Sequence, residues 1–153
     1  MATIEISGGS EMERKLKEMM DKLGDGTLLR VGFLESATYH PGGEYVATIA
    51  ASNEFGDPGN NQPPRPFFRN MIAANLPAWP LEVGKVIKAV DFDGEKALQL
   101  MGERIKDQLQ GSIRELVEPP LSPYTIKKKG FDKPLIDTGH MLNSVDYDVK
   151  EIE

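Results

Sequence analysis

The sequence predicts a single α+β domain spanning residues 1–153, in which a small, mostly antiparallel sheet packs against several helices. Three observations predict this class. Apolar residues keep to one face of a long helical segment at about 93–116. Two strand-like segments lie far apart in the chain, and prolines cluster between the helical segments in long loops.

The N-terminal part is expected to alternate helix, strand and helix. Residues 11–23 carry apolar side chains at helical spacing, with Ser10 as the expected N-cap and Gly24 as the expected C-terminal stop. Residues 27–34 then alternate with the period of two that a half-buried strand requires. Helical spacing returns over residues 45–56, which end in glycine.

A proline-rich segment follows this helix. Residues 57–66 contain four prolines, which restrict the backbone too strongly for a helix to continue, so we expect an exposed arm. We expect this arm, and also residues 118–132, to be mobile in a free subunit and to become ordered against neighbouring proteins. Phe67 and Phe68 are expected to anchor the base of the arm.

The middle of the chain is predominantly helical. Residues 67–76 show helical spacing, and Pro77 and Pro80 are expected to interrupt it before a short helix over residues 81–90. Asp93 is expected to cap the long helix that runs to about residue 116.

The C-terminal part is expected to form two short helices and a strand. Ser122 precedes a proline, a typical helix start, and that helix is expected to end near residue 129. Asp137 or Thr138 is expected to cap the next short helix. Residues 145–153 alternate in the pattern of a half-buried strand.

The composition excludes several functional classes. The chain has no cysteine, so it has no disulfide and no thiolate metal site. Its net charge of −6 opposes general binding to nucleic acid, which depends on neutralising phosphates. The N-terminal segment lacks the basic and then apolar order of a signal peptide, so we expect a soluble protein that is made in the cytoplasm and does not bind membranes.

One segment looks like a catalytic motif. Leu135, Ile136, Asp137, Thr138 and Gly139 match the apolar-apolar-Asp-Thr-Gly pattern that presents the carboxylate of an aspartic protease. Such an enzyme also needs a second carboxylate and a β-rich lobe beyond the motif, and only fourteen residues follow it here. We therefore favour a helix cap, and an aspartic protease using Asp137 is the less favoured alternative.

Other catalytic and metal-binding patterns are weaker still. Residues 91–95 resemble a calcium loop but lack its third oxygen position and its final glutamate, so a helix cap is the better interpretation. His40 and His140 have no second histidine at metal-ligand spacing. We therefore expect no enzymatic activity, no bound metal and no cofactor.

The only basic run comprises Lys127, Lys128 and Lys129. A solvated helix end is the simplest interpretation, because lysines there also favour the helix dipole. If the chain forms a ring, however, several copies of this weak patch could contact one DNA molecule inside the pore.

Three stretches taken together resemble the tail-completion, or head-to-tail joining, proteins of long-tailed bacteriophages. The first contains residues 31–39 and a helix that ends in the motif Asn53-Glu54-Phe55-Gly56. The second is a proline arm whose interface candidates are Arg65, Pro66, Phe67, Phe68 and Arg69. The third covers residues 119–149 and includes Ser122, Thr125, Gly130 and the segment from Pro134 to Gly139.

This resemblance covers roughly residues 30–150 and implies a structural role in the virion. Members of the family form a hexameric ring in the neck, bound on one side to head-completion proteins and on the other to the tail terminator or tail tube. Genome DNA would pass through the ring without sequence-specific binding. A tail-terminator or head-completion protein is the nearest alternative, and no catalytic residue carries over from the family.

Overall fold

The computed structural model describes residues 8–24, 26–34, 43–116 and 139–152. These residues form six α-helices, one 3₁₀ turn and one two-stranded antiparallel sheet, which confirms the predicted α+β class. The elements are, in chain order, α1 Gly9–Leu23, β1 Thr27–Phe33, α2 Val46–Phe55, η1 Pro58–Asn60, α3 Phe67–Asn75, α4 Trp79–Ala89, α5 Gly94–Glu115, α7 His140–Asn143 and β2 Val145–Glu151.

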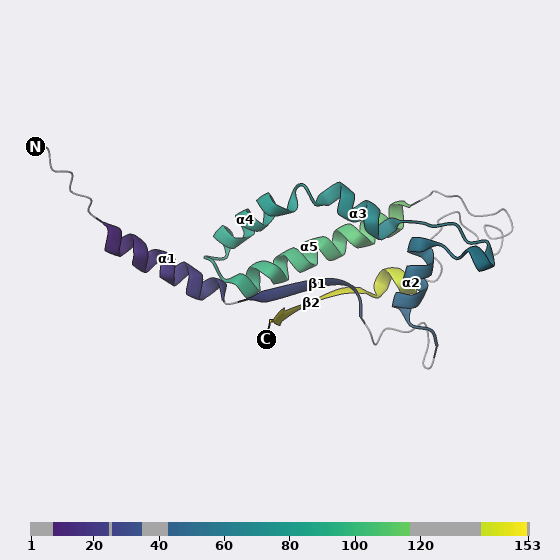
Figure 1. Ribbon diagram of the computed structural model, residues 1–153, viewed down its shortest axis with the longest axis horizontal. Coiled ribbons are helices and arrows are strands. Elements are labelled where there is room, and N and C mark those ends of the chain that lie inside the picture. Colours follow the sequence, from purple (N-terminus) through teal and green to yellow (C-terminus); the bar gives the residue numbers. More distant parts are fainter. Residues whose placement is uncertain (1–7, 25, 35–42, 117–138, 153) are drawn as a thin grey trace, which may run out of the picture.

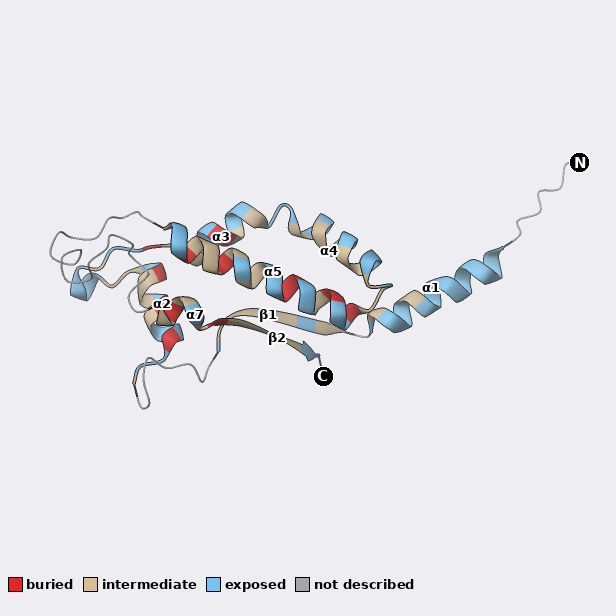
Figure 2. Ribbon diagram, turned by 180° about the vertical axis from the view of Figure 1, so that it is seen from behind, coloured by how far each residue is buried: buried red, intermediate tan, exposed pale blue. Residues whose placement is uncertain are grey.

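Helix α5 is the centre of the molecule. The sheet lies along one side of it, and α3 and α4 lie along the other (Figure 1). Buried residues recur along the length of α5 (Figure 2). The predicted cap is confirmed, because the Asp93 side chain accepts a hydrogen bond from the Lys96 backbone N–H at 3.1 Å.

The sheet joins two segments that are more than one hundred residues apart. Thr27 pairs with Glu151 at one end, and Phe33 pairs with Val145 at the other. The sheet packs closely on α5 at Gly102, where an added Cβ atom would come 2.4 Å from the Tyr147 ring. A glycine at this position is therefore required for the sheet to approach the helix.

The main hydrophobic core lies at the C-terminal half of α5, where α2, α3, α7 and the start of β2 meet. Its ring contacts include an edge-to-face pair between Phe33 and Phe67, with centroids 6.3 Å apart. The buried members of this core are Val46, Ala50, Phe67, Met71, Leu109, Ile113, Met141 and Val145.

Three predicted helix boundaries are wrong in detail. Helix α1 begins before Ser10, with Gly8 at the N-cap and no capping side chain. Pro80 does not interrupt a helix but lies in the first turn of α4, where a missing backbone N–H costs nothing. The N-cap of α7 is Gly139, and the candidate caps Asp137 and Thr138 lie outside the described residues.

Helix α1 projects from the opposite end of the molecule to the core (Figure 1). The predicted C-terminal stop at Gly24 is confirmed, since its N–H bonds the Met20 carbonyl. None of the side chains of α1 is buried. Among the described helices, none has the length and apolar character that a bilayer span requires.

Candidate functional site

The candidate site is the junction formed by α2, the proline arm and α3. The arm begins with a closed turn rather than an open loop. Asp57 and Gln62 exchange two backbone hydrogen bonds of 2.8 and 2.9 Å. The Asp57 carboxylate also accepts from the Gly59 N–H at 3.1 Å and from the Asn60 side chain at 2.7 Å. The start of the arm is therefore fixed by its own hydrogen bonds.

The second half of the arm is tied to the end of α2 through Asn53. The Arg65 backbone N–H donates to the Asn53 carbonyl at 2.7 Å, and the Gln62 side chain donates to the Asn53 side-chain oxygen at 3.0 Å. Gly56 makes this approach possible, because its φ is +79° and a Cβ there would lie 2.8 Å from the Gln62 carbonyl oxygen. The predicted free arm is thus folded against α2.

Glu54 is the central group of the junction. Glu54 is only 5% exposed, and its carboxylate accepts hydrogen bonds from the backbone N–H groups of Phe68 and Arg69 at 2.9 and 3.2 Å. The Arg69 side chain donates to the same carboxylate at 2.7 Å. A carboxylate from α2 therefore satisfies the free N–H groups and the positive end of α3.

The surface beside Glu54 carries groups that are typical of protein interfaces. Phe55 is 67% exposed, and the Arg69 guanidinium lies 5.2 Å from the centre of its ring. A hollow of about 260 Å³ opens next to this pair. It is lined by Phe33, Ala47, Ala50, Ala51, Glu54, Phe55, Phe67, Phe68 and Arg69. Exposed aromatic and arginine side chains around an apolar hollow favour binding to a protein.

Arg65 is a buried cation. The residue is 7% exposed, and within the described chain its side chain forms no hydrogen bond or ion pair. Its Nε is both buried and without an acceptor, and this burial lowers the pKa of the guanidinium. An arginine nevertheless stays protonated at neutral pH, so Arg65 is a buried positive charge without an ion-pair partner among the described residues.

The predicted interface residues therefore differ strongly in their surroundings. The expectation of an arm exposed throughout residues 57–66 is wrong at Arg65. Phe67 is 1% exposed and belongs to the hydrophobic core of its own chain, so it is a core residue and not a surface group. Pro66 and Phe68 are half-buried, whereas Arg69 reaches the surface.

The candidates outside this junction gain no support as a catalytic site. Lys127, Lys128, Lys129, Asp137 and His40 lie outside the described residues. Within the described ranges, no group of three acidic, histidine or cysteine side chains is arranged to hold a metal ion.

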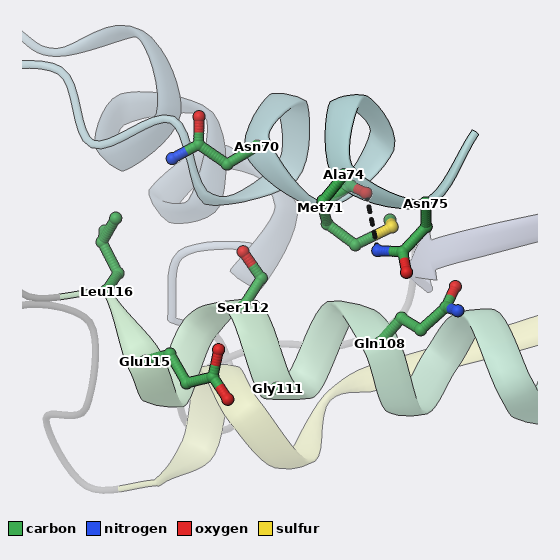
Figure 3. A pocket seen from close by; sticks show the side chains of 9 residues that line it. All are labelled: Asn70, Met71, Ala74, Asn75, Gln108, Gly111, Ser112, Glu115 and Leu116. Atoms are coloured by element: carbon green, nitrogen blue, oxygen red, sulfur yellow. Dashed lines mark hydrogen bonds between the residues drawn. The ribbon is translucent and has the colours of Figure 1, made fainter. Parts of the chain in front are cut away.

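A hollow of about 510 Å³ lies between α3 and α5 (Figure 3). Its Ser112 hydroxyl donates to the Phe67 carbonyl at 2.6 Å, and its Asn75 amide donates to the Met71 carbonyl at 2.8 Å. Both groups are thus engaged with backbone. Among the described residues of this lining, Glu115 is the one ionisable group, and the Ser112 hydroxyl donates to the backbone carbonyl and not to this carboxylate. The described residues of the hollow therefore do not place a hydroxyl and a base together as nucleophilic catalysis requires.

Sequence reasoning missed the roles of Asn53 and Glu54. Both were visible as part of the Asn-Glu-Phe-Gly motif, but a motif does not reveal which distant N–H groups it will meet. Comparison with models of protein families, with curated proteins and with solved structures found no match for this chain. The phage family suggested by the motifs therefore stays a prediction.

Proposed function

We propose that this chain is a non-enzymatic structural protein of a tailed bacteriophage that forms a ring at the head-tail junction and joins the tail to the DNA-filled head. The observation that carries the proposal is the Glu54 junction. It physically unites two of the motifs on which the resemblance rests, Asn53–Gly56 and Arg65–Arg69. The co-occurrence of these motifs thus has a structural reason, and an accidental likeness becomes a weaker explanation.

The chemistry of the junction also suits assembly better than catalysis. Its carboxylate accepts three N–H hydrogen bonds from α3 and so serves to hold two elements together. What the junction offers at its surface is an aromatic ring, an arginine and an apolar hollow. These are the side chains that dominate binding energy at protein interfaces.

Within this proposal the partners are further copies of the chain in a hexamer, a head-completion protein and a tail-terminator or tail-tube protein. The location is the virion neck, after synthesis in the host cytoplasm. The net charge of −6 suits a ring through which DNA must slide without sticking, and any DNA contact would fall to Lys127, Lys128 and Lys129.

A role as a tail-terminator or head-completion protein is the second candidate, because it would place the same kind of interface in a neighbouring layer. The two roles predict different particles when the gene carries a nonsense mutation. Loss of a neck protein leaves full heads and separate finished tails in electron micrographs of lysates. Loss of a terminator leaves tails of abnormal length, and normal joined particles would contradict both roles.

Complementation of that mutant tests the junction itself. The variant Arg65→Met removes a buried charge that has no partner in the described chain, so the subunit should be as stable as the wild type or slightly more stable. It should nevertheless fail to restore joined particles. Phe55→Ala should behave in the same way, because the ring is exposed. The matched control is Leu76→Ala, an exposed apolar residue outside the junction, which should complement fully.

These variants distinguish a functional surface from a structural one. If Arg65→Met unfolds the subunit, the guanidinium serves the fold and not a partner. If both variants complement as well as Leu76→Ala, the junction does not contact any protein of the particle. Cleavage of peptides that is lost in Asp137→Asn would instead establish the aspartic-protease alternative.

A further inference from the structure

Helix α1 presents an apolar stripe that nothing in the described chain covers. Met12, Leu16 and Met20 are 66%, 53% and 69% exposed. Their spacing of four residues places them on one face of the helix. One exposed apolar side chain is ordinary, but a row of three on one face of a helix is not. Helix α1 projects from the body of the molecule and is exposed along most of its length (Figure 2).

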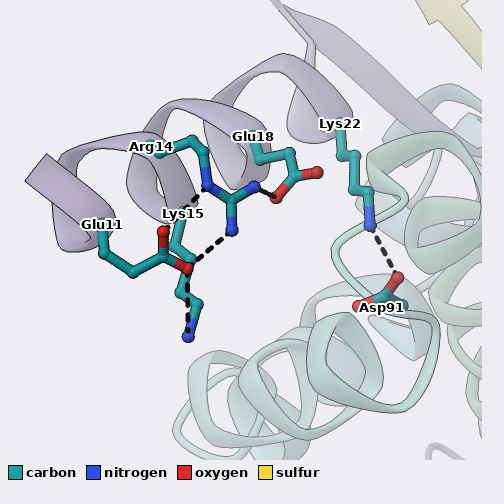
Figure 4. A network of polar contacts seen from close by, with 6 residues as sticks. All are labelled: Glu11, Arg14, Lys15, Glu18, Lys22 and Asp91. Atoms are coloured by element: carbon teal, nitrogen blue, oxygen red, sulfur yellow. Dashed lines mark hydrogen bonds and ion pairs between the residues drawn. The ribbon is translucent and has the colours of Figure 1, made fainter.

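The opposite face of α1 is already satisfied by its own ion pairs. Arg14 bridges Glu11 at 2.7 Å and Glu18 at 3.3 Å (Figure 4). Lys22 binds Asp91 at 2.6 Å, which ties the C-terminal end of α1 to the turn before α5. The polar face is therefore engaged within the chain, and the apolar stripe remains for another molecule.

The charge of α1 favours another copy of itself as that molecule. The helix contains four acidic residues (Glu11, Glu13, Glu18, Asp21) and four basic residues (Arg14, Lys15, Lys17, Lys22), so its net charge is zero, whereas the whole chain carries −6. Two copies repel each other over most of their surface, but they can approach through α1 without that repulsion.

The order of residues in α1 also fits an antiparallel partner. Leu16 lies midway between Met12 and Met20. A two-fold axis at Leu16 therefore sets Leu16 against Leu16 of the second copy, and Met12 against its Met20. On one flank of the stripe, Glu13 and Lys17 have no ion pair within the described chain. Reversing the second helix brings each of them next to the oppositely charged residue.

We propose that two copies of this chain pair through α1 in an antiparallel, two-fold contact, with the stripe Met12, Leu16 and Met20 at its centre and Glu13–Lys17 pairs at its edge. Helices of 15 residues bury less area than the roughly 1,200 Å² of a stable standard interface. The dimer is therefore weak and forms only at high protein concentration. The inference does not depend on the proposed role in phage.

Single cysteines test the arrangement directly, because the chain contains none of its own. Leu16→Cys should form a disulfide-linked dimer under mild oxidation, at a yield about tenfold above that of Arg14→Cys on the opposite face. Met12→Cys should cross-link with a size-tagged Met20→Cys protein, and neither should cross-link efficiently with itself. Self-linking of both variants would demonstrate a parallel pair and overturn the antiparallel one, as would equal yields for Leu16→Cys and Arg14→Cys.

Charge exchange tests the proposed edge contacts. In sedimentation of the full chain, Glu13→Lys should weaken dimerisation about tenfold, as a repulsive pair at a small interface should. The double variant Glu13→Lys/Lys17→Glu should restore it, since the pairs are only reversed. Failure of the double variant to restore the dimer, or a wild type that stays monomeric at the highest concentration, overturns the proposal.

A last variant tests whether the apolar stripe binds a second copy or the body of its own chain. Leu16→Glu should abolish the dimer but leave the thermal unfolding midpoint unchanged, because Leu16 contacts no core residue. A lowered midpoint of the monomer would mean that α1 docks on its own subunit, which contradicts the inference.

Discussion

Helix α1 and the α2–α3 junction are opposite cases of how sequence relates to burial. The sequence of α1 has the clear apolar periodicity of a helix packed on a core, yet no side chain of α1 is buried. The α2 helix buries Val46, Ala50 and even Glu54. The difference teaches that an amphipathic pattern predicts a helix and one apolar face, whereas tertiary neighbours decide what covers that face.

The largest expected effect follows from removing the ring of Phe67. Phe67→Ala should lower the free energy of unfolding by about 3–5 kcal/mol, because Phe67 is fully buried in the core. Leu16→Ala in α1 is the matched substitution and should change it by less than about 0.5 kcal/mol. Urea denaturation at a protein concentration too low for dimerisation measures both changes in unfolding free energy. Similar losses for the two variants would remove the contrast between the regions.

A second comparison uses one glutamate from each region. Glu54→Ala leaves three N–H donors of α3 without their acceptor and should destabilise the fold by about 2–4 kcal/mol. Glu18→Ala removes only an exposed pair with Arg14 and should cost at most about 0.5 kcal/mol. If Glu54→Ala unfolds at the same denaturant concentration as the wild type, the junction is held by its apolar contacts alone.

Hydrogen exchange sharpens the comparison without any substitution. The amides of α1 should exchange much faster than those of α3, because α1 is attached at one end and lacks a buried face. At high protein concentration the exchange in α1 should slow if copies pair there. Equal protection of the two helices in dilute monomer would mean that α1 is more firmly packed than its exposure implies.

The smallest effect concerns the exposed ion pair of the sheet. The Arg30 guanidinium, which donates to the Asp148 carboxylate at 2.8 Å, holds the pKa of that carboxyl below its usual range. The pair therefore stabilises the fold fully above the unfolded-state pKa of about 3.9, and its contribution is lost as the pH falls toward the lower folded-state pKa.

Asp148→Asn should accordingly flatten the loss of stability below about pH 4, with little change at pH 7. Thermal unfolding measured from pH 2 to 7 tests this expectation. Arg30→Gln should reduce the same loss of stability below about pH 4, and the double variant should reduce it no further. If Asp148→Asn instead loses stability more steeply below about pH 4, the carboxylate destabilises the folded protein at this position.

Local signals were sufficient for most of the elements. The two strands, the long helix and the Asp93 cap follow from periodicity and from capping chemistry within a few residues, and all are confirmed. The cap at Ser10 is wrong, because Gly8 begins α1 two residues earlier. A serine can cap a helix, but the sequence does not dictate that the helix starts there.

The candidate site could be predicted only as a set of motifs. Arg65 was expected on an exposed arm because prolines surround it, and its burial depends on a backbone bond to Asn53 twelve residues earlier. The contact of Glu54 with α3 likewise joins residues fourteen and fifteen apart. Such contacts between elements are set by packing, and no local pattern encodes them.

The pairing of β1 with β2 has a consequence for synthesis on the ribosome. Phe33 meets Val145 in the sheet, so β1 emerges long before its partner has been translated. At about 5–20 residues per second, the delay is on the order of ten seconds. During this interval the backbone of β1 lacks its partner strand, and the apolar side chains of Leu29, Val31 and Phe33 have nothing to pack on, which favours aggregation. In overexpressing cells, aggregation of incomplete chains, and not the stability of the folded protein, should therefore limit the yield.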